Sequence, residues 1–268
     1  MKVLCFAHYD PDGKIRKYVH FILDVFRNLG YEIHFVSTAS LDQTTLASIK
    51  PLCATACIRE NAGYDFGSWK KAILGIDPAN VSHLLLLNSS IIGPVFPVER
   101  ILDVMEKRKC DFWGVTESWE IRRHLQSYFL GFKHSLLVHP CFAEYWRQIE
   151  PAGDRQSVIN RYELGLADYF KARGFRAGAY LTHGRLRIAH LFSSRWNFRK
   201  RGNPTLLYPD LLLKTGVPFI KLQLLRENPG SADLRRVSRL AEASFPTFRD
   251  ELISDLDLPA YRRTEGMP

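Results

Sequence analysis

Short apolar runs alternate with stretches of helical spacing along the first third of the chain. The apolar runs predict strands at Val3–Tyr9, Glu32–Thr38, Ala54–Ile58 and His83–Leu87. Between the first two, apolar residues recur every three or four positions from Ile15 to Leu29, which predicts a helix that ends at Gly30. Strands separated by helices are typical of a parallel sheet covered by helices, so the sequence predicts an α/β fold.

The remaining chain continues this pattern and then loses it. Further helices are predicted at Asp65–Leu74, Pro97–Lys107, Ser135–Ile149 and Val158–Gly174, and strands at Asp111–Thr116 and Leu125–Phe132. After about residue 180 a basic, aromatic segment is followed by two apolar stretches and a polar tail. We therefore expect one domain over residues 1–230 and a tail, residues 231–268, that packs on this domain or trails from it.

Composition and charge narrow the class of protein. Hydrophobic residues make up 46% of the 268 residues, and no apolar run approaches the roughly 20 residues that span a bilayer. The N-terminus enters a strand directly and shows no signal-peptide pattern, so we expect a cytoplasmic protein. The net charge of +9 should attract nucleic acid, an acidic membrane surface or a phosphorylated substrate. Without a helix-turn-helix, RNP or zinc motif, nucleic acid is excluded as a partner.

Three polar loops follow predicted strands, where open α/β sheets bind ligands. They read HYDPDG (8–13), RENAGYDFGSWK (59–70) and NSSIIGP (88–94). The motifs GxGxxG, GxxxxGK[ST], GxSxG and HExxH are all absent, which disfavours dehydrogenases, P-loop enzymes, serine hydrolases and zinc peptidases. Five cysteines without a CxxC pair favour reduced thiols over a zinc site.

Several motifs, in order along the chain, resemble the rhamnan synthesis protein F family. They are ENAGYDFGSWK, LLLLNSSIIGPVFP, DFWGVTES, HLQSYFLGFK, YELGLADYFKARGF, NPTLLYPDLL and PFIKLQLLRENP. Members of this family are bacterial glycosyltransferase-like proteins of cell-surface polysaccharide assembly. The resemblance covers about residues 1 to 230 and implies a GT-A-like, Rossmann-type domain. Such a domain has a central, mainly parallel sheet flanked by helices and uses a nucleotide-diphosphate sugar, and here we expect a helical C-terminal extension to follow it.

The resemblance implies a donor pocket lined by these loops. Asn61 suits a base or ribose, Gly63 allows close backbone approach, and Asp65 can accept from sugar hydroxyls. The alternative is a capped turn with aromatic core anchors, which is the expected role of Trp69. The donor-binding candidates are His8, Asn61, Gly63, Tyr64, Asp65, Asn88, Ser89, Ser90 and Arg195.

The place of a metal ion in this pocket stays open. GT-A enzymes usually carry Asp-x-Asp after the fourth strand, and the resembling family usually carries Asn-Asp-Ser. This chain has Asn88, Ser89 and Ser90, which are poor sole ligands for Mg²⁺ or Mn²⁺. Either no metal binds, or its ligands come from elsewhere, or activity is weakened.

A metal-independent clamp on the diphosphate is our working hypothesis, because guanidinium groups suit phosphate oxygens. A solvated basic face or an anionic-lipid patch is the alternative. The clamp candidates are His183, Arg185, Arg187, His190, Arg195, Arg199, Lys200 and Arg201.

Catalysis and acceptor binding are assigned by the same resemblance. Glu163 fits the general base of an inverting transfer, and Asp65 is a second catalytic candidate. The acceptor side should carry Trp113, which could stack on a sugar ring, together with Thr116, Glu117, His124 and Gln126.

Two functions remain in competition. The first is transfer of rhamnose or another deoxyhexose from a nucleotide-diphosphate sugar to a lipid-linked glycan, at the inner face of the cytoplasmic membrane, whose anionic surface would suit a basic protein. The second is a non-catalytic module that binds a nucleotide sugar or glycan inside a synthase assembly. The missing Asp at position 89 is the feature that favours the second.

Overall fold

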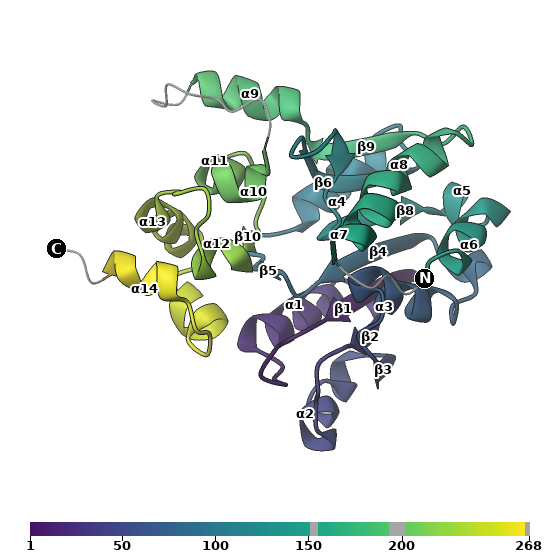
Figure 1. The fold of residues 1–268 in the computed structure, drawn as a ribbon, viewed down its shortest axis with the longest axis horizontal. Coiled ribbons are helices and arrows are strands. Elements are labelled where there is room, and N and C mark those ends of the chain that lie inside the picture. The colour runs from purple at the N-terminus through teal and green to yellow at the C-terminus, as the bar shows by residue number, and fades with distance from the viewer. Residues whose placement is uncertain (151–154, 193–201, 266–268) are drawn as a thin grey trace.

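The computed structural model describes residues 1–150, 155–192 and 202–265 (Figure 1). This part of the chain forms an eight-stranded sheet in the order β3-β2-β1-β4-β8-β6-β7, with β9 also paired to β6. The strands of this sheet are β1 Lys2–His8, β2 Tyr31–Ser37, β3 Thr55–Ile58, β4 His83–Asn88, β6 Phe112–Ser118, β7 His124–Leu125, β8 Phe129–Lys133 and β9 Ala177–Leu181.

Most of the strand pairs are parallel. β1 pairs in parallel with β2 and β4, β2 with β3, and β6 with β9. β8 runs antiparallel between β4 and β6, and the short β7 is antiparallel to β6. The predicted fold class, a central and mainly parallel sheet flanked by helices, is confirmed.

Helices cover both faces of the sheet because side chains alternate along each strand. Leu4 and Phe6 of β1 belong to one hydrophobic cluster, and Val3, Cys5 and Ala7 belong to the other. The first cluster packs on α1 Lys17–Asn28 and α4 Glu99–Lys107, and the second on α3 Tyr64–Ile73, α6 Pro140–Arg147 and α8 Leu164–Lys171. The other helices before residue 192 are α2 Gln43–Ala47, η1 Lys50–Leu52, η2 Pro78–Asn80, α5 His134–Leu137, α7 Arg155–Val158, η3 Ile159–Glu163 and α9 His183–Leu191.

Two predicted elements are divided in the structure. The helix expected over Ser135–Ile149 is split into α5 and α6, and Pro140 begins the second helix because its ring allows no continuous helical bond. The strand expected over Leu125–Phe132 becomes β7 and β8. Between them, the N–H of Ser127 bonds the Glu163 carboxylate instead of a neighbouring strand.

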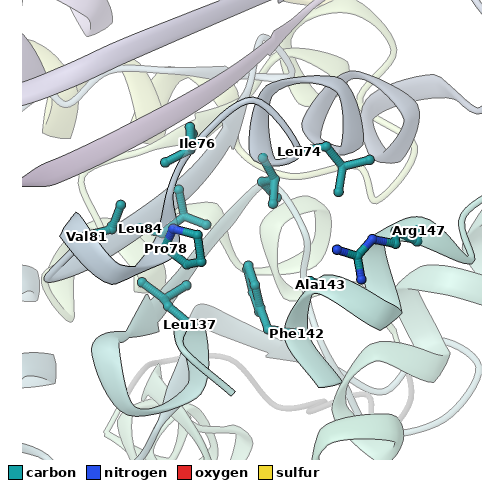
Figure 2. Close-up of a pocket in the computed structure, with 10 residues that line it drawn as sticks. Leu74, Ile76, Pro78, Val81, Leu84, Leu137, Phe142, Ala143 and Arg147 are labelled. Atoms are coloured by element: carbon teal, nitrogen blue, oxygen red, sulfur yellow. The ribbon is translucent and has the colours of Figure 1, made fainter. Parts of the chain in front are cut away.

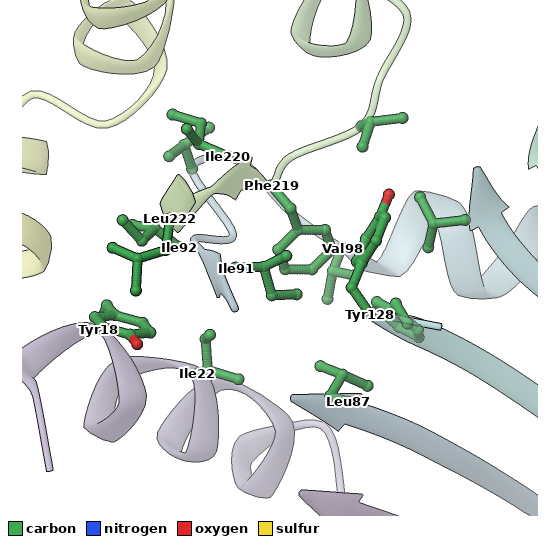
Figure 3. Close-up of a cluster of buried hydrophobic side chains, with 14 of the residues drawn as sticks. Tyr18, Ile22, Leu87, Ile91, Ile92, Val98, Tyr128, Phe219, Ile220 and Leu222 are labelled. Atoms are coloured by element: carbon green, nitrogen blue, oxygen red, sulfur yellow. The ribbon is translucent and has the colours of Figure 1, made fainter. Parts of the chain in front are cut away.

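A second, two-stranded sheet brings the C-terminal part of the chain back to the end of β4. β5 Ile91–Ile92 pairs antiparallel with β10 Ile220–Lys221. In Figure 3 both strands lie over α1, with Tyr18 and Ile22 facing them. The pairing places residues that follow Phe219 beside the turn that follows β4.

The expected helical C-terminal extension is confirmed. The described part of residues 231–268 contains α13 Leu234–Ser244, η4 Phe248–Ile253 and α14 Pro259–Glu265. Three further helices, α10 Pro204–Leu207, α11 Pro209–Lys214 and α12 Leu222–Arg226, precede it within the residues predicted as the domain. Leu234, Val237 and Leu252 are buried in the same hydrophobic cluster as Phe6 of β1. Among the described residues, no helix combines the length and the apolar character that crossing a bilayer requires.

Trp69 on α3 offers a test of this architecture. Its ring is fully buried against the sheet, and its Nε1 donates to the Leu87 carbonyl of β4 at 3.0 Å. Replacing a buried aromatic ring by Ala costs about 3–5 kcal/mol, so Trp69→Ala should lower the free energy of unfolding in urea by that amount. Lys71→Ala, an exposed change on the same helix, should stay within about 0.5 kcal/mol of the parent. Equal losses in both variants would contradict the placement of α3.

Candidate functional site

A polar cleft of about 570 Å³ opens beyond the carboxyl end of β4. Its walls come from the start of α3, the end of β4 and the turn after it, the segment around β7, the end of η3, the start of α10 and the strand β10. The polar side chains that carry the argument below are Asp65, Asn88, Ser90, Gln126, Glu163 and Lys221. This is where open α/β sheets bind ligands.

The loop at 59–67 turns the chain so that α3 begins at the cleft. Gly63, with a φ of +81°, is the residue before the helix, a conformation that favours glycine. Arg59 donates to the Ala62 carbonyl, and a side chain at Gly67 would collide with both groups. Burial lowers the pKa of the Arg59 guanidinium. The folded-back loop leaves Tyr64 and Asp65 lining the cleft.

One hydrogen bond joins this loop to the turn after β4. The Asn88 side-chain amide donates to Oδ2 of Asp65 at 2.7 Å. Both residues line the cleft, so the expectation that these two loops share one cavity is confirmed.

The turn itself is held by its own side chains. Oδ1 of Asn88 accepts from the Ser90 N–H at 3.2 Å and from the Ser90 hydroxyl. The Ser89 hydroxyl accepts from the Tyr9 N–H at 3.0 Å and donates to the Tyr9 carbonyl at 3.1 Å. Ser89 therefore connects the loop after β1 to this turn and does not line the cleft.

The loop after β1 has a structural role in place of the expected ligand contacts. Asp10 pairs with Arg16 at 2.8 Å, and both side chains are buried. Burial alone would raise the pKa of Asp10, but the hydrogen bonds from Arg16 and the backbone outweigh it and lower that pKa. Nδ1 of His8 lies 2.9 Å from the Ser37 hydroxyl, and its ring packs on Phe35.

Lys221 is a cleft residue that the sequence pattern does not single out. Its Nζ donates to the Ser90 hydroxyl at 2.8 Å and lies 5.3 Å from the centroid of the Tyr128 ring. The one available signal is a single charge inside the apolar stretch PFIKLQLL. It places an ammonium group against the turn where a metal-binding carboxylate was expected.

Glu163, the last residue of η3, lies on the wall of the cleft that this helix forms. Its Oε1 accepts from both the N–H and the hydroxyl of Ser127, each at 2.9 Å. Two donors on one oxygen fix the carboxylate at the cleft surface.

Two of the predicted acceptor-side residues also line the cleft. Gln126 donates from Nε2 to Oδ1 of Asn203 at 2.9 Å, and its Oε1 accepts from the Thr116 hydroxyl at 2.7 Å. Thr116 is buried behind Gln126. His124 lines the cleft, and its Nδ1 bonds the Arg122 carbonyl at 2.7 Å. Asn203, from the segment NPTLLYP, is a second wall residue not predicted from the sequence.

Other predicted residues lie elsewhere. Trp113 is buried in the core with its ring 5.6 Å from that of Phe129, a position that contradicts stacking on an acceptor sugar. Glu117 pairs with Arg123 at 2.7 Å and accepts from the His183 N–H, so it holds the start of α9.

The donor candidates outside the cleft differ in their surroundings. Asn61 is exposed on its loop, Gly63 is buried within it, and His8 is buried below the loop after β1. Arg195 lies outside the described residues.

The structure describes four of the eight residues of the expected cationic clamp. Its described members His183, Arg185, Arg187 and His190 all belong to α9 and do not line the cleft. The other members, Arg195, Arg199, Lys200 and Arg201, lie outside the described residues. Across residues 1–150, 155–192 and 202–265, no group of three or more His, Cys, Asp or Glu side chains is placed to hold a metal ion.

A second, apolar cavity of about 150 Å³ lies between the end of α3, η2, α5 and α6 (Figure 2). Leu84, Leu137 and Phe142 line it, and Arg147 stands at its side. Apolar walls with one cation offer no acid or base pair for chemistry, so the polar cleft is the candidate site.

Comparison with known proteins gives a family match that covers most of the chain. A family model described as rhamnan synthesis protein F matches residues 33–247. The virulence protein VirA of Vibrio anguillarum is 30% identical over 200 residues, which cover 66% of this chain and 64% of VirA. This chain thus spans slightly less than two thirds of the length of that relative.

Solved structures with a similar course of the chain have low sequence identity to it. A glycosyltransferase involved in glycosylation of the major capsid of PBCV-1 aligns with a TM-score of 0.46 at 11% identity, over 90% of this chain and 98% of its own. HddC from Yersinia pseudotuberculosis aligns with a TM-score of 0.44 at 9% identity, over 68% of this chain and 91% of its own.

The buried His8 predicts a loss of stability in mild acid. Burial lowers the pKa of His8 to about 4, below its ordinary value of 6.5. The unfolded chain therefore takes up this proton at higher pH than the folded protein, and acid favours unfolding. We expect His8 to account for a loss of about 2 kcal/mol between about pH 7 and about pH 5.

Urea unfolding of the parent and of His8→Asn at both pH values measures this loss. Asn keeps a donor for Ser37 but does not titrate, so its stability should fall less on acidification. His20 and His34, whose pKa values burial also lowers, titrate in both proteins and cancel in the difference. If the two proteins lost the same stability between these pH values, His8 would be protonated as easily in the folded protein as in the unfolded chain.

Proposed function

This chain belongs to the rhamnan synthesis protein F family, and we propose that it is a glycosyltransferase that moves a sugar from a nucleotide-diphosphate donor to a growing cell-surface polysaccharide. The observation that carries this proposal is the cleft beyond β4, in which Asp65, bonded to Asn88, and Glu163, bonded to Ser127, both line the wall. It offers carboxylates for hydroxyl groups and a cation for phosphate.

On the donor side, Asp65 is the residue we assign to sugar or ribose hydroxyls. Its Oδ2 is anchored by Asn88 at 2.7 Å, which fixes the direction of the carboxylate. Tyr64, the first residue of α3, adds an aromatic face on the same wall. This division of roles makes Asp65 a donor-binding residue and leaves base catalysis to Glu163.

Glu163 suits the role of general base. In the step that we propose, the acceptor hydroxyl oxygen forms a bond to the anomeric carbon of the donor. The bond from this carbon to the diphosphate oxygen breaks, and its electron pair stays on the diphosphate. The hydroxyl proton passes to the Glu163 carboxylate, and attack from the face opposite the leaving group inverts the anomeric centre.

The family name is the ground for the sugar that we propose, rhamnose or another deoxyhexose. The alternative is a module that binds a nucleotide sugar or glycan without turnover inside a synthase assembly. The feature in its favour is Ser89, which stands where the family usually has Asp.

We further propose that α9 contacts an anionic membrane surface at the inner face of the cytoplasmic membrane, where a lipid-linked acceptor would be reached. Ile188, Leu191 and Phe192 are 57%, 73% and 88% exposed and follow one another at helical spacing. Arg185 and Arg187 are exposed on the same helix, which lies at the edge of the molecule in Figure 1. Exposed apolar groups beside cations suit an anionic bilayer surface.

Replacing Glu163 by Gln tests the enzymatic role. Gln can still accept both hydrogen bonds from Ser127, so the fold and donor affinity should persist. Loss of a general base lowers turnover by about 10²–10⁴-fold. Turnover of nucleotide sugars with a membrane acceptor fraction, and donor binding by calorimetry, provide the two readouts.

Glu144→Gln, the same change at an exposed position of α6, is the matched control and should leave turnover unchanged. Near-normal turnover in Glu163→Gln would reject the assignment of the base. Donor binding without any turnover in the parent protein would favour the binding module.

Membrane contact is tested by replacing Ile188 and Leu191 together with Ser. Sedimentation with phosphatidylglycerol vesicles should then fall about tenfold or more, because two exposed apolar side chains are lost from the contact. Val138→Ser, at an exposed apolar position elsewhere, should change nothing. Equal sedimentation of the parent with neutral phosphatidylcholine and anionic phosphatidylglycerol vesicles would contradict a preference of α9 for an anionic surface.

A further inference from the structure

The oxygen atoms of the turn after β4 are committed to protein donors. Asn88 Oδ1 accepts from the N–H and hydroxyl of Ser90, and the Ser89 hydroxyl is engaged by both backbone groups of Tyr9. A divalent cation needs several oxygen ligands that point toward it, preferably carboxylates. The residues at the position of Asp-x-Asp do not fit such an ion.

The charge beside the turn opposes a dication as well. Nζ of Lys221 donates to the Ser90 hydroxyl at 2.8 Å, so an ion bound to Ser90 would lie next to an ammonium group. A dication and an ammonium group that share Ser90 as a neighbour would repel each other strongly inside a partly enclosed cleft. The carboxylate of Asp65 is bonded to the Asn88 amide and that of Glu163 to Ser127.

Lys221 is fixed to the turn by the backbone as well as by its side chain. It is the last residue of β10, in register with Ile91 of β5, and the next residue, Leu222, donates its N–H to the Ser90 carbonyl at 2.9 Å. Its neighbours Ile220 and Leu222 are buried over α1, as Figure 3 shows.

The side chain of Lys221 lies over the ring of Tyr128. Nζ lies 5.3 Å from the centroid of the Tyr128 ring, whose electron-rich face favours a cation. The ammonium is thus built into the cleft by a strand, a hydrogen bond and an aromatic ring.

We propose that Lys221 binds the diphosphate of the donor and supplies the positive charge that a divalent metal ion would otherwise provide. This inference rests on the proposed glycosyltransferase function. When the bond between the anomeric carbon and the diphosphate oxygen breaks, the electron pair stays on that oxygen, and the ammonium stabilises the added charge. No proton or metal ion has to join the leaving group for the charges to balance.

Calorimetric titration with UDP, GDP and dTDP, and with the corresponding nucleosides, tests this role. The parent protein should bind one of these diphosphates with equal affinity in EDTA and in Mn²⁺. Lys221→Met should lower the affinity for that diphosphate by about tenfold to a hundredfold, as expected for the loss of a charge-assisted hydrogen bond. The affinity for the nucleoside should stay unchanged. Lys214→Met, the same change at an exposed position of α11, should leave both affinities at the parent values.

The outcomes separate this inference from the proposed function. Parent binding that requires Mn²⁺, or a Lys221→Met variant that binds the diphosphate like the parent, would overturn the role of Lys221 and leave glycosyl transfer in place. A parent protein that binds none of these nucleoside diphosphates, with or without Mn²⁺, would overturn both. Circular dichroism verifies folding, and Lys221→Gln replaces the Met variant if that protein does not fold.

Discussion

Three consecutive side chains at the end of β4 hold the cleft together, because each of them bonds a different part of the chain. Asn88 bonds Asp65 in the first turn of α3, Ser89 bonds the backbone after β1, and Ser90 bonds Lys221 of β10. The turn emerges from the middle of the sheet, where β4 is paired on both sides and cannot shift. Asp65 and Lys221, charged groups on two walls of the cleft, are thus held from the end of this strand.

This arrangement changes the meaning of the serine at position 89. In the sequence, Ser89 appears as the loss of a carboxylate. In three dimensions its hydroxyl donates to one backbone group of Tyr9 and accepts from the other, which an ionised carboxylate cannot do. The side chain at position 89 thus closes a contact between two loops. The positive charge beside this turn comes from Lys221, which is far away in the sequence.

The sequence predicts the parts of this molecule that depend on local patterns. Undiluted apolar runs mark β1 and β4, and polar loops that follow them mark the ligand edge of the sheet. Strand alternation could also have placed Trp113, since it shares its face of β6 with the buried Val115. The parts that escape prediction depend on distant pairing. Lys221 reaches Ser90 across 131 positions, and no local pattern encodes that contact.

The composite origin of the cleft has a consequence for the newly made protein. Asp65, Asn88 and Glu163 all emerge from the ribosome before β10, yet the wall that contains Lys221 forms only after β10 has paired with β5. A nascent chain or a product terminated before β10 would thus carry the carboxylates of the cleft without the ammonium group of Lys221. Translation itself therefore delays the moment at which the cleft gains its ammonium group until β10 has been synthesised.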